Sequence, residues 1–274
     1  MIKLLLIDID GTLVADDKMI PDKNHQAIQS LLAKNIKVTL VTGRSYHSSL
    51  DVIHAITEDI PIVFQNGAFI YQPQTNRILQ KEYLSPKIAT FLLEQGRAHN
   101  LYTILFNDFL DPIDMIIESL YEGGYAPYLQ RNLARTKLVD QILAPQDMKI
   151  SEVVLLGSEK IIDKIHQSAT ELFPGEFSPV KSFDLEGEVF FEFFGPSVSK
   201  AHAVHFLSKH FQVPLSDIMF IGDSFNDIEA LKIVGLPIAM GNAIKEVKDQ
   251  SKFICKTNND AGVAHAIETF LLKE

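Results

Sequence analysis

A short apolar run near the start of the chain constrains the fold most, because residues 2–7 (IKLLLI) end directly at Asp8. So short and apolar a run is typical of a β-strand buried on both faces, as in parallel sheets. Residues 24–34 carry apolar side chains at helical spacing, residues 36–41 indicate a second strand, and residues 45–57 a second helix. With a third strand at residues 62–65, this alternation predicts a doubly wound parallel α/β sheet with helices on both faces.

The same alternation returns near the other end of the chain. Strands are expected at residues 217–221, 236–240 and 253–255, and helices at residues 227–234 and 262–272. Two separated segments of one pattern are most simply the two parts of one domain, interrupted by an insertion.

The middle of the chain differs in composition, with more proline, glycine and aromatic residues from about Tyr83 to Ser197. Helical patterns at residues 88–96 and 161–172 alternate there with strand-like runs at 152–156 and 189–194. Residues 188–194 (EVFFEFF) predict a strand in a sheet covered on one face. We therefore expect one domain made of residues 1–82 and 199–274, with a second, α+β domain of residues 83–198 inserted into it.

Composition limits the partners of the chain. Its 274 residues carry a formal net charge of −10, which argues against nucleic acid or an anionic membrane as a partner. No apolar run approaches the roughly 18 residues of a membrane span, and the single cysteine, Cys255, excludes an intrachain disulfide. A cytoplasmic protein that binds a small molecule is expected, and the sequence gives no oligomeric state.

Asp8 and Asp10 are the first candidates for chemistry. Residues two apart in an extended chain point to the same side, and the carboxyl edge of a parallel sheet is where such folds place ligands. Paired carboxylates repel unless a cation lies between them or one is protonated, and Mg²⁺ prefers oxygen ligands. Gly11 would allow a sharp turn with exposed N–H groups that can hold phosphate, and Thr12 adds a hydroxyl. Alone, the two acids could equally be a solvated turn.

Four segments together resemble the motifs of the haloacid dehalogenase superfamily. Residues 8–12 (DIDGT) are similar to its first motif, residues 42–44 (TGR) to its second, Lys200 within residues 199–201 (SKA) to its third, and residues 222–227 (GDSFND) to its fourth. Each alone has an ordinary interpretation as a turn, a helix start or a cap.

The position and length of the insertion resemble the Cof-type branch, which carries a class IIB α/β cap. The resemblance implies that residues 1–82 and 199–274 are the catalytic core and that residues 83–198 are a cap domain that sets substrate specificity. Residues 65–68 (QNGA) and 239–243 (AMGNA) also resemble stretches of that branch. The chain departs from the pattern at Ala201, where glycine often follows the lysine, and in residues 257–262 (TNNDAG). Neither departure touches the expected chemistry.

The resemblance implies a Mg²⁺-dependent phosphatase acting through an aspartyl phosphate. Asp8 would be the nucleophile, and Asp10 the general acid and then the general base. Asp8, the backbone carbonyl of Asp10 and Asp223 would hold Mg²⁺. The expected phosphate contacts are the backbone of Ile9 together with Thr42, Gly43, Lys200 and Asn226. The supporting residues would be Thr12, Arg44 and Asp227, the last orienting the metal shell from behind.

Several alternatives stay open on the sequence alone. A phosphomutase would use the same aspartyl phosphate, whereas a catalytically silent sugar-phosphate sensor would be expected to lack Asp8 or Asp10. A response-regulator receiver has about half this length, and no P-loop string is present. The basic residues Arg131, Arg135 and Lys137 are either a solvated face or part of a site for an acidic or phosphorylated substrate. Sugar phosphates, flavin mononucleotide and pyridoxal phosphate are all candidate substrates.

Overall fold

The computed structural model describes residues 1–55, 60–185 and 187–272. It divides into two compact units, which are described separately: the first comprises residues 1–44, 49–80 and 199–274, the second residues 45–48 and 81–198. The predicted roles of these parts of the chain, a catalytic core and a cap that sets substrate specificity, stay predictions.

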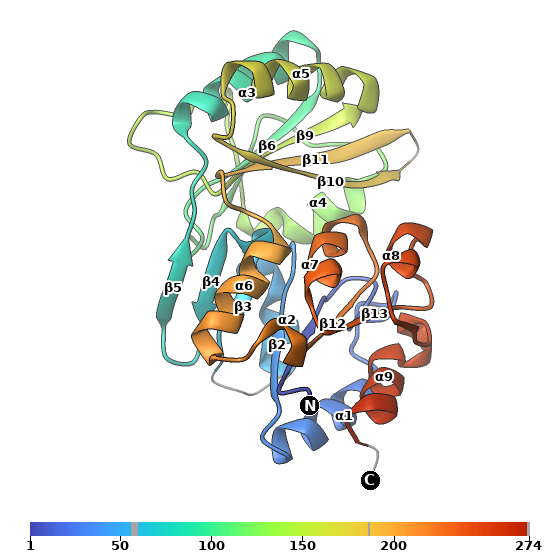
Figure 1. The fold of residues 1–274 in the computed structure, drawn as a ribbon. Helices are drawn as coiled ribbons and strands as arrows, with labels where there is room; N and C mark the ends of the chain where they lie inside the picture. The colour runs from blue at the N-terminus through green and yellow to red at the C-terminus, as the bar shows by residue number, and fades with distance from the viewer. Residues whose placement is uncertain (56–59, 186, 273–274) are drawn as a thin grey trace. The chain divides into compact units, whose positions relative to one another are not determined.

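A parallel sheet forms the centre of the first unit (Figure 1). Its order is β14-β13-β12-β1-β2 and every neighbouring pair is parallel. The strands are β1 (Leu4–Ile7), β2 (Lys37–Leu40), β12 (Ile218–Gly222), β13 (Leu236–Ala239) and β14 (Phe253–Ile254). All four residues of β1 have no exposed surface, so the predicted parallel α/β sheet with a strand buried on both faces is confirmed.

Helices pack around this sheet, with α1 against α9 and α6 against α7. The helices of the first unit are α1 (Asp22–Ala33), α2 (Leu50–Ala55), α6 (Lys200–Phe211), α7 (Ile228–Ile233), α8 (Lys245–Asp249) and α9 (Gly262–Phe270). The helix expected at residues 45–57 is shorter, since a 3₁₀ turn, η1 (His47–Ser49), precedes α2, and residues 56 and 57 lie outside the described ranges.

The third predicted strand, β3 (Ile62–Phe64), joins β2 through a parallel bridge between Val41 and Val63. It also begins a three-stranded sheet with β4 (Phe69–Gln72) and β5 (Arg77–Lys81). The sequence did not predict β4 and β5. It predicted a strand that ends at residue 65, where the 3₁₀ turn η2 (Gln65–Gly67) begins.

The second unit is built on a six-stranded sheet of order β10-β11-β9-β6-β7-β8. Its pairs are antiparallel except β7 with β8. The strands are β6 (Tyr102–Phe106), β7 (Met115–Ile117), β8 (Thr136–Leu138), β9 (Glu152–Ser158), β10 (Ser178–Leu185) and β11 (Glu188–Phe194). An α+β insertion is confirmed.

Both faces of this second sheet are covered. Phe191 and Phe193 pack in one cluster with residues of α3 (Pro86–Ala98) and α5 (Glu159–Leu172). Phe190 lies in a second cluster, against Tyr125 and Tyr128 around α4 (Ala126–Asn132). The expectation that β11 is covered on one face only is therefore wrong, because the aromatic residues around α4 bury the other face.

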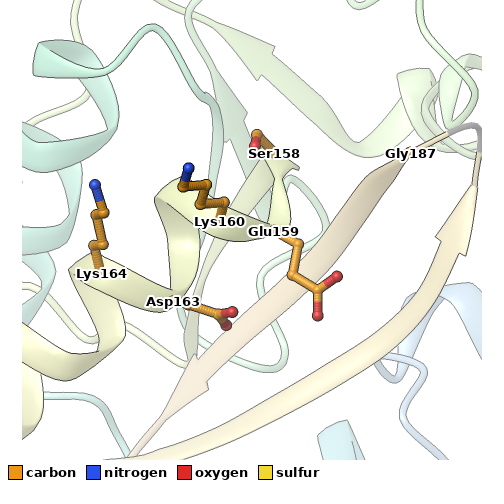
Figure 2. A pocket seen from close by; sticks show the side chains of 6 residues that line it. All are labelled: Ser158, Glu159, Lys160, Asp163, Lys164 and Gly187. Atoms are coloured by element: carbon orange, nitrogen blue, oxygen red, sulfur yellow. The ribbon is translucent and has the colours of Figure 1, made fainter.

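A surface hollow of about 570 Å³ opens beside the first turns of α5 (Figure 2). Its lining residues are Ser158, Glu159, Lys160, Asp163, Lys164 and Gly187. All are exposed, and none belongs to the motif segments. In the described ranges, every helix is too short or too polar to cross a membrane.

Asn24 is a buried structural amide whose removal should destabilise the first unit. Its Nδ2 donates to the carbonyl oxygen of Leu13 (3.1 Å) and its Oδ1 accepts from the N–H of Ala264 (2.9 Å). Asn24→Ala leaves both backbone groups buried without partners, so we expect the free energy of unfolding to fall by roughly 2–4 kcal/mol. Urea denaturation measures this change. The exposed Gln26→Ala on the same helix should change it by less than about 0.5 kcal/mol, and equal effects would contradict the assignment.

Candidate functional site

The predicted residues of the first and fourth motifs lie at one edge of the parallel sheet. β1 pairs with β12 so that Ile7 faces Ile221, and the N–H of Asp8 donates to the carbonyl oxygen of Ile221 (3.1 Å). Asp8 and Asp223 therefore leave adjacent strands at the same carboxyl edge, where open α/β sheets bind ligands.

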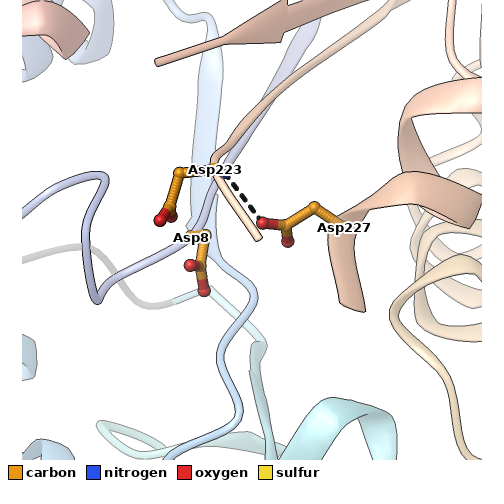
Figure 3. Close-up of side chains that lie close together, drawn as sticks. All are labelled: Asp8, Asp223 and Asp227. Atoms are coloured by element: carbon orange, nitrogen blue, oxygen red, sulfur yellow. Dashed lines mark hydrogen bonds between the residues drawn. The ribbon is translucent and has the colours of Figure 1, made fainter. Parts of the chain in front are cut away.

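Three carboxylates gather at this edge (Figure 3). Asp8, Asp223 and Asp227 each offer one oxygen, and these oxygens lie within 4.8 Å of one another. All three side chains are buried. Such an oxygen cluster suits a hard divalent cation. The side chain of Asp10 is not part of it.

Lys200 holds two of these carboxylates together. Its Nζ donates to Oδ1 of Asp8 (2.8 Å) and to Oδ1 of Asp227 (2.7 Å), and only 1% of the side chain is exposed. Burial alone would lower the pKa of Lys200, but the nearby Asp227 and Asp8 carboxylates raise it above its usual value. The ammonium group of Lys200 therefore stays charged between the two carboxylates.

Asp227 serves to position its neighbours. While Oδ1 accepts from Lys200, Oδ2 accepts from the backbone N–H groups of Asp223 (2.9 Å) and Ser224 (3.0 Å). A Cβ on Gly222 would lie 2.5 Å from the Asp227 carboxylate, so glycine is needed there. Both carboxylate oxygens of Asp227 are thus engaged by neighbouring groups, and its expected role in orienting the metal shell stays a prediction.

The electrostatics of the cluster favour a bound cation. Burial and, after it, the nearby Asp227 carboxylate raise the pKa of Asp8 above its usual value and raise the pKa of Asp223 to about 7. The Thr12 hydroxyl opposes this for Asp223, since it donates to Oδ1 (2.8 Å). Because crowded buried carboxylates are costly in the charged form, the residues present fit a divalent cation.

Gly11 allows this close approach. Its φ is +72°, in the region that favours glycine, and a Cβ would lie 2.3 Å from Oδ2 of Asp223. A side chain at this position would push Asp223 out of place. The first motif therefore needs glycine at position 11, because the carboxylate of Asp223 in the fourth motif occupies the space that a side chain would need.

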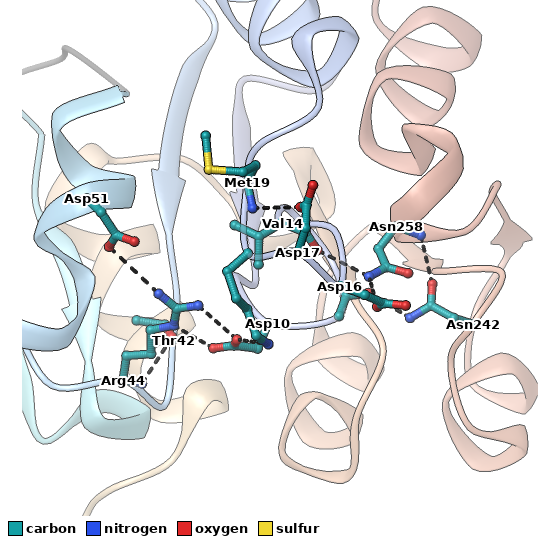
Figure 4. Close-up of polar contacts among 12 residues, drawn as sticks. Asp10, Val14, Asp16, Asp17, Met19, Thr42, Arg44, Asp51, Asn242 and Asn258 are labelled. Carbon is teal, nitrogen blue, oxygen red and sulfur yellow. Dashed lines mark hydrogen bonds and ion pairs between the residues drawn. The ribbon is translucent and has the colours of Figure 1, made fainter. Parts of the chain in front are cut away.

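Asp10 lies in a different environment, paired with Arg44 (Figure 4). Arg44 donates from Nε to Oδ2 (2.6 Å) and from Nη2 to Oδ1 (2.8 Å), and Lys18 donates to Oδ1 (3.2 Å). Burial would raise the pKa of Asp10, but these two cations lower it to about 2. In this arrangement Asp10 is a carboxylate that can accept a proton but has none to give.

The second motif lies beside this pair. The hydroxyl oxygen of the buried Thr42 accepts from the backbone N–H of Arg44 (3.0 Å), so its own hydrogen can be donated elsewhere. The carbonyl oxygen of Ile9 accepts from Leu13 (2.9 Å) and Val14 (3.1 Å), which closes the turn after Asp8.

Two asparagines outside the proposed site hold the loop that follows β1 (Figure 4). Asn242 Nδ2 donates to the carbonyl oxygen of Gly11 (2.8 Å), and Asn242 Oδ1 accepts from the N–H of Asn258 (2.9 Å). Asn258 Nδ2 then donates to the carbonyl oxygen of Val14 (3.2 Å). Residues 239–243 resemble the Cof-type branch and residues 257–262 depart from its pattern, but nothing local in the sequence shows that these asparagines reach the first motif.

The three basic residues singled out in the second unit differ in burial and partners. Arg135 is buried and forms an ion pair with Asp114, whereas Arg131 and Lys137 are exposed. A site made of all three residues for an acidic substrate thus gains no support.

A family model described as haloacid dehalogenase-like hydrolase matches residues 5–267. The chain belongs to this family. The predicted membership of the haloacid dehalogenase superfamily is thereby confirmed.

Relatives match along the whole chain. The 5-amino-6-(5-phospho-D-ribitylamino)uracil phosphatase YwtE of Bacillus subtilis is 29% identical, with 98% of each chain covered. A haloacid dehalogenase-like hydrolase from Bacteroides thetaiotaomicron has a similar solved structure, with a TM-score of 0.83 at 22% identity over 99% of this chain and 100% of that one. The subclass IIB sugar phosphatase BT4131 has a TM-score of 0.78 at 18% identity, with 98% of each chain covered. These two structures support the fold alone.

Cation binding at the carboxylate cluster should depend on pH. In the cation-free protein the pKa of Asp223 is about 7 and that of Asp8 is raised, so at low pH a cation must displace protons. A raised carboxyl pKa also means that the cation-free protein loses stability as pH rises from the unfolded pKa toward the folded one. Adding Mg²⁺ should therefore raise the melting temperature more at about pH 8 than at about pH 5.5.

Differential scanning fluorimetry with MgCl₂ measures this effect without relying on catalysis. Asp223→Asn should abolish most of the Mg²⁺-dependent shift at both pH values. An equal shift at both pH values in the unmodified protein would contradict the assignment.

Proposed function

We propose that this protein is a Mg²⁺-dependent phosphatase that hydrolyses small phosphorylated metabolites through an aspartyl phosphate on Asp8. The observation that carries the proposal is the buried Lys200 ammonium between Asp8 and Asp227, beside Asp223 at the edge of the sheet. Family membership and phosphatase-named relatives support a phosphoric monoester hydrolase.

Asp8 is the proposed nucleophile. An oxygen of its carboxylate attacks phosphorus, the bond from phosphorus to the leaving oxygen breaks, and an aspartyl phosphate forms. Lys200, 2.8 Å from Asp8, reduces the repulsion between the carboxylate and the phosphate as they meet. Mg²⁺, held by Asp8, Asp223 and the backbone carbonyl of Asp10, would supply charge neutralisation to the approaching phosphate.

Asp10 is the proposed proton-transfer residue. Paired with Arg44, and with a pKa of about 2, it is ready to take the proton of the water that hydrolyses the aspartyl phosphate. To donate a proton to the leaving oxygen in the first step, it must leave Arg44 and become protonated. The Asp10–Arg44 pair therefore suits the hydrolysis of the aspartyl phosphate better than its formation.

The phosphoryl oxygens would be held by Thr42, the N–H groups of Ile9 and Gly43, Lys200 and Asn226. The Thr42 hydroxyl hydrogen is available for this, because its oxygen already accepts from Arg44. Thr12, Arg44 and Asp227 support the site through the contacts with Asp223, Asp10 and Lys200.

The leaving group is proposed to be a sugar or sugar alcohol. YwtE is named for a ribityl phosphate, and a structurally similar protein is named a sugar phosphatase. Flavin mononucleotide also carries a phosphorylated ribityl chain, and pyridoxal phosphate remains in the panel as a phosphomonoester without one. The presence of both Asp8 and Asp10 disfavours a silent sensor.

Phosphate release from a panel of these esters tests the proposal. Wild type should hydrolyse at least one ester, and only with Mg²⁺. Asp8→Asn and Asp10→Asn should each lose about a hundredfold or more, because each removes a group used in covalent or proton-transfer catalysis. Asp249→Asn, on the surface of α8, is the matched control and should keep full activity.

If Asp8→Asn were as active as wild type, the nucleophile would be wrong. A phosphomutase would instead move phosphate between positions of a sugar with little release, which chromatography of the sugar phosphates detects.

The roles of Asp8 and Asp10 can be distinguished with p-nitrophenyl phosphate, because its leaving group does not need to be protonated. Asp10→Asn should release about one equivalent of nitrophenol per protein in a burst and then stall as the aspartyl phosphate. Asp8→Asn should show no burst. Intact-protein mass spectrometry after an acid quench detects the adduct, and its absence in Asp10→Asn would show that Asp10 is not the base of the second step.

A further inference from the structure

Asn66 lies beside several proposed phosphate contacts of the first unit, although none of the four motifs includes it. It belongs to the turn η2 that follows β3, and only 1% of it is exposed. Its backbone N–H donates to the carbonyl oxygen of Thr42 (2.9 Å), and the N–H of Gln65 donates to that of Arg44 (2.9 Å). The turn is thus bonded directly to the second motif.

The side-chain amide of Asn66 touches two proposed phosphate contacts. A Cβ built on Gly43 would lie 3.3 Å from Asn66 Oδ1 and 3.4 Å from Asn66 Nδ2, so the amide lies beside that glycine. Asn66 Oδ1 also accepts from Asn226 Nδ2 (2.9 Å). The amide therefore connects the second motif to the fourth.

The same turn also packs against the start of α6. A Cβ on Gly67 would lie 2.8 Å from the carbonyl oxygen of Ser199, the residue before Lys200. Asn66 thus lies within one turn of backbone that contacts the second, third and fourth motifs.

One group of Asn66 is left without a partner. Its Nδ2 is buried and makes no hydrogen bond within the described part of the chain. Buried polar groups in native proteins nearly always have a partner, so an orphaned donor in a ligand site calls for an acceptor from the ligand. A phosphoryl oxygen is such an acceptor.

We propose that Asn66 contacts the substrate, and that its Nδ2 donates a hydrogen bond to a non-bridging oxygen of the phosphoryl group. This inference rests on the proposed phosphatase function and adds a donor that the motifs do not contain. The hydrogen bond from Asn226 Nδ2 to Asn66 Oδ1 would orient the Asn66 amide for this contact, because it holds Oδ1 toward Asn226 and leaves Nδ2 turned away.

A purely structural explanation competes with this one. Asn66 has a φ of 55° and a ψ of 16°, and asparagine is favoured in this left-handed region whatever its side chain contacts. Glycine adopts the same backbone without strain but has no amide. Asn66→Gly therefore separates a role of the backbone from a role of the side chain, and Asn66→Asp, which keeps the acceptor for Asn226, tests the Nδ2 donor itself.

The experiment measures the affinity of the full-length protein for inorganic phosphate with Mg²⁺ present, by calorimetry and as the inhibition constant in the phosphatase assay. Asn66→Gly should lower the melting temperature by less than Asn24→Ala does, because it leaves only Asn226 Nδ2 without its acceptor. It should weaken phosphate binding by about tenfold or more, as expected for a lost bond to a charged group. Asn66→Asp keeps the acceptor for Asn226 and should weaken binding further, because its carboxylate repels phosphate.

Asn24→Ala is the matched control, a buried amide of the same unit whose bonds both go to backbone. It should lower the melting temperature and leave phosphate affinity unchanged. Asn66→Gly that binds phosphate as wild type does, or an equal loss of affinity in Asn24→Ala, would overturn the role of Asn66 while leaving the phosphatase proposal intact. Wild type that neither binds phosphate nor hydrolyses any ester would overturn both.

Discussion

The site depends on one buried ammonium group between two carboxylates. Lys200 neutralises part of the charge of Asp8 and Asp227, and without it three acids would be buried within 4.8 Å of one another. Removing one partner of a buried ion pair is strongly destabilising. The carboxylates of Asp8 and Asp227 fix the position of the Lys200 ammonium group as much as helix α6 does. A single lysine is therefore enough to form the third motif.

The sequence predicted the residues whose position follows from strand ends. Asp8, Thr42 and Asp223 each follow a short apolar strand, and parallel strands bring their carboxyl ends to one edge. It could not predict contacts that depend on side-chain direction. The Arg44–Asp10 pair turns an expected acid into a carboxylate with a pKa of about 2, and residues 34 apart give no local sign of that pairing.

The same limit explains the asparagines. Asn66, Asn242 and Asn258 stand in turns, where asparagine is common for backbone reasons alone. Only the folded chain shows that Asn242 and Asn258 hold the loop after β1 and that Asn66 reaches the second and fourth motifs. The aromatic cover around α4 was missed for a related reason, since the pattern of β11 does not reveal which element packs on its second face.

Charge balance gives a reason for neutral donors at the phosphate. When all three carboxylates are ionised, the one ammonium group leaves two uncompensated negative charges at the cluster, which a divalent cation would neutralise. A phosphate dianion entering this neutral site gains most from N–H and O–H donors that add no further charge, such as the Thr42 hydroxyl, the Gly43 backbone and the Asn66 amide. Another lysine in place of such a donor would bind phosphate in the ground state and hold the product as tightly, so neutral donors favour release.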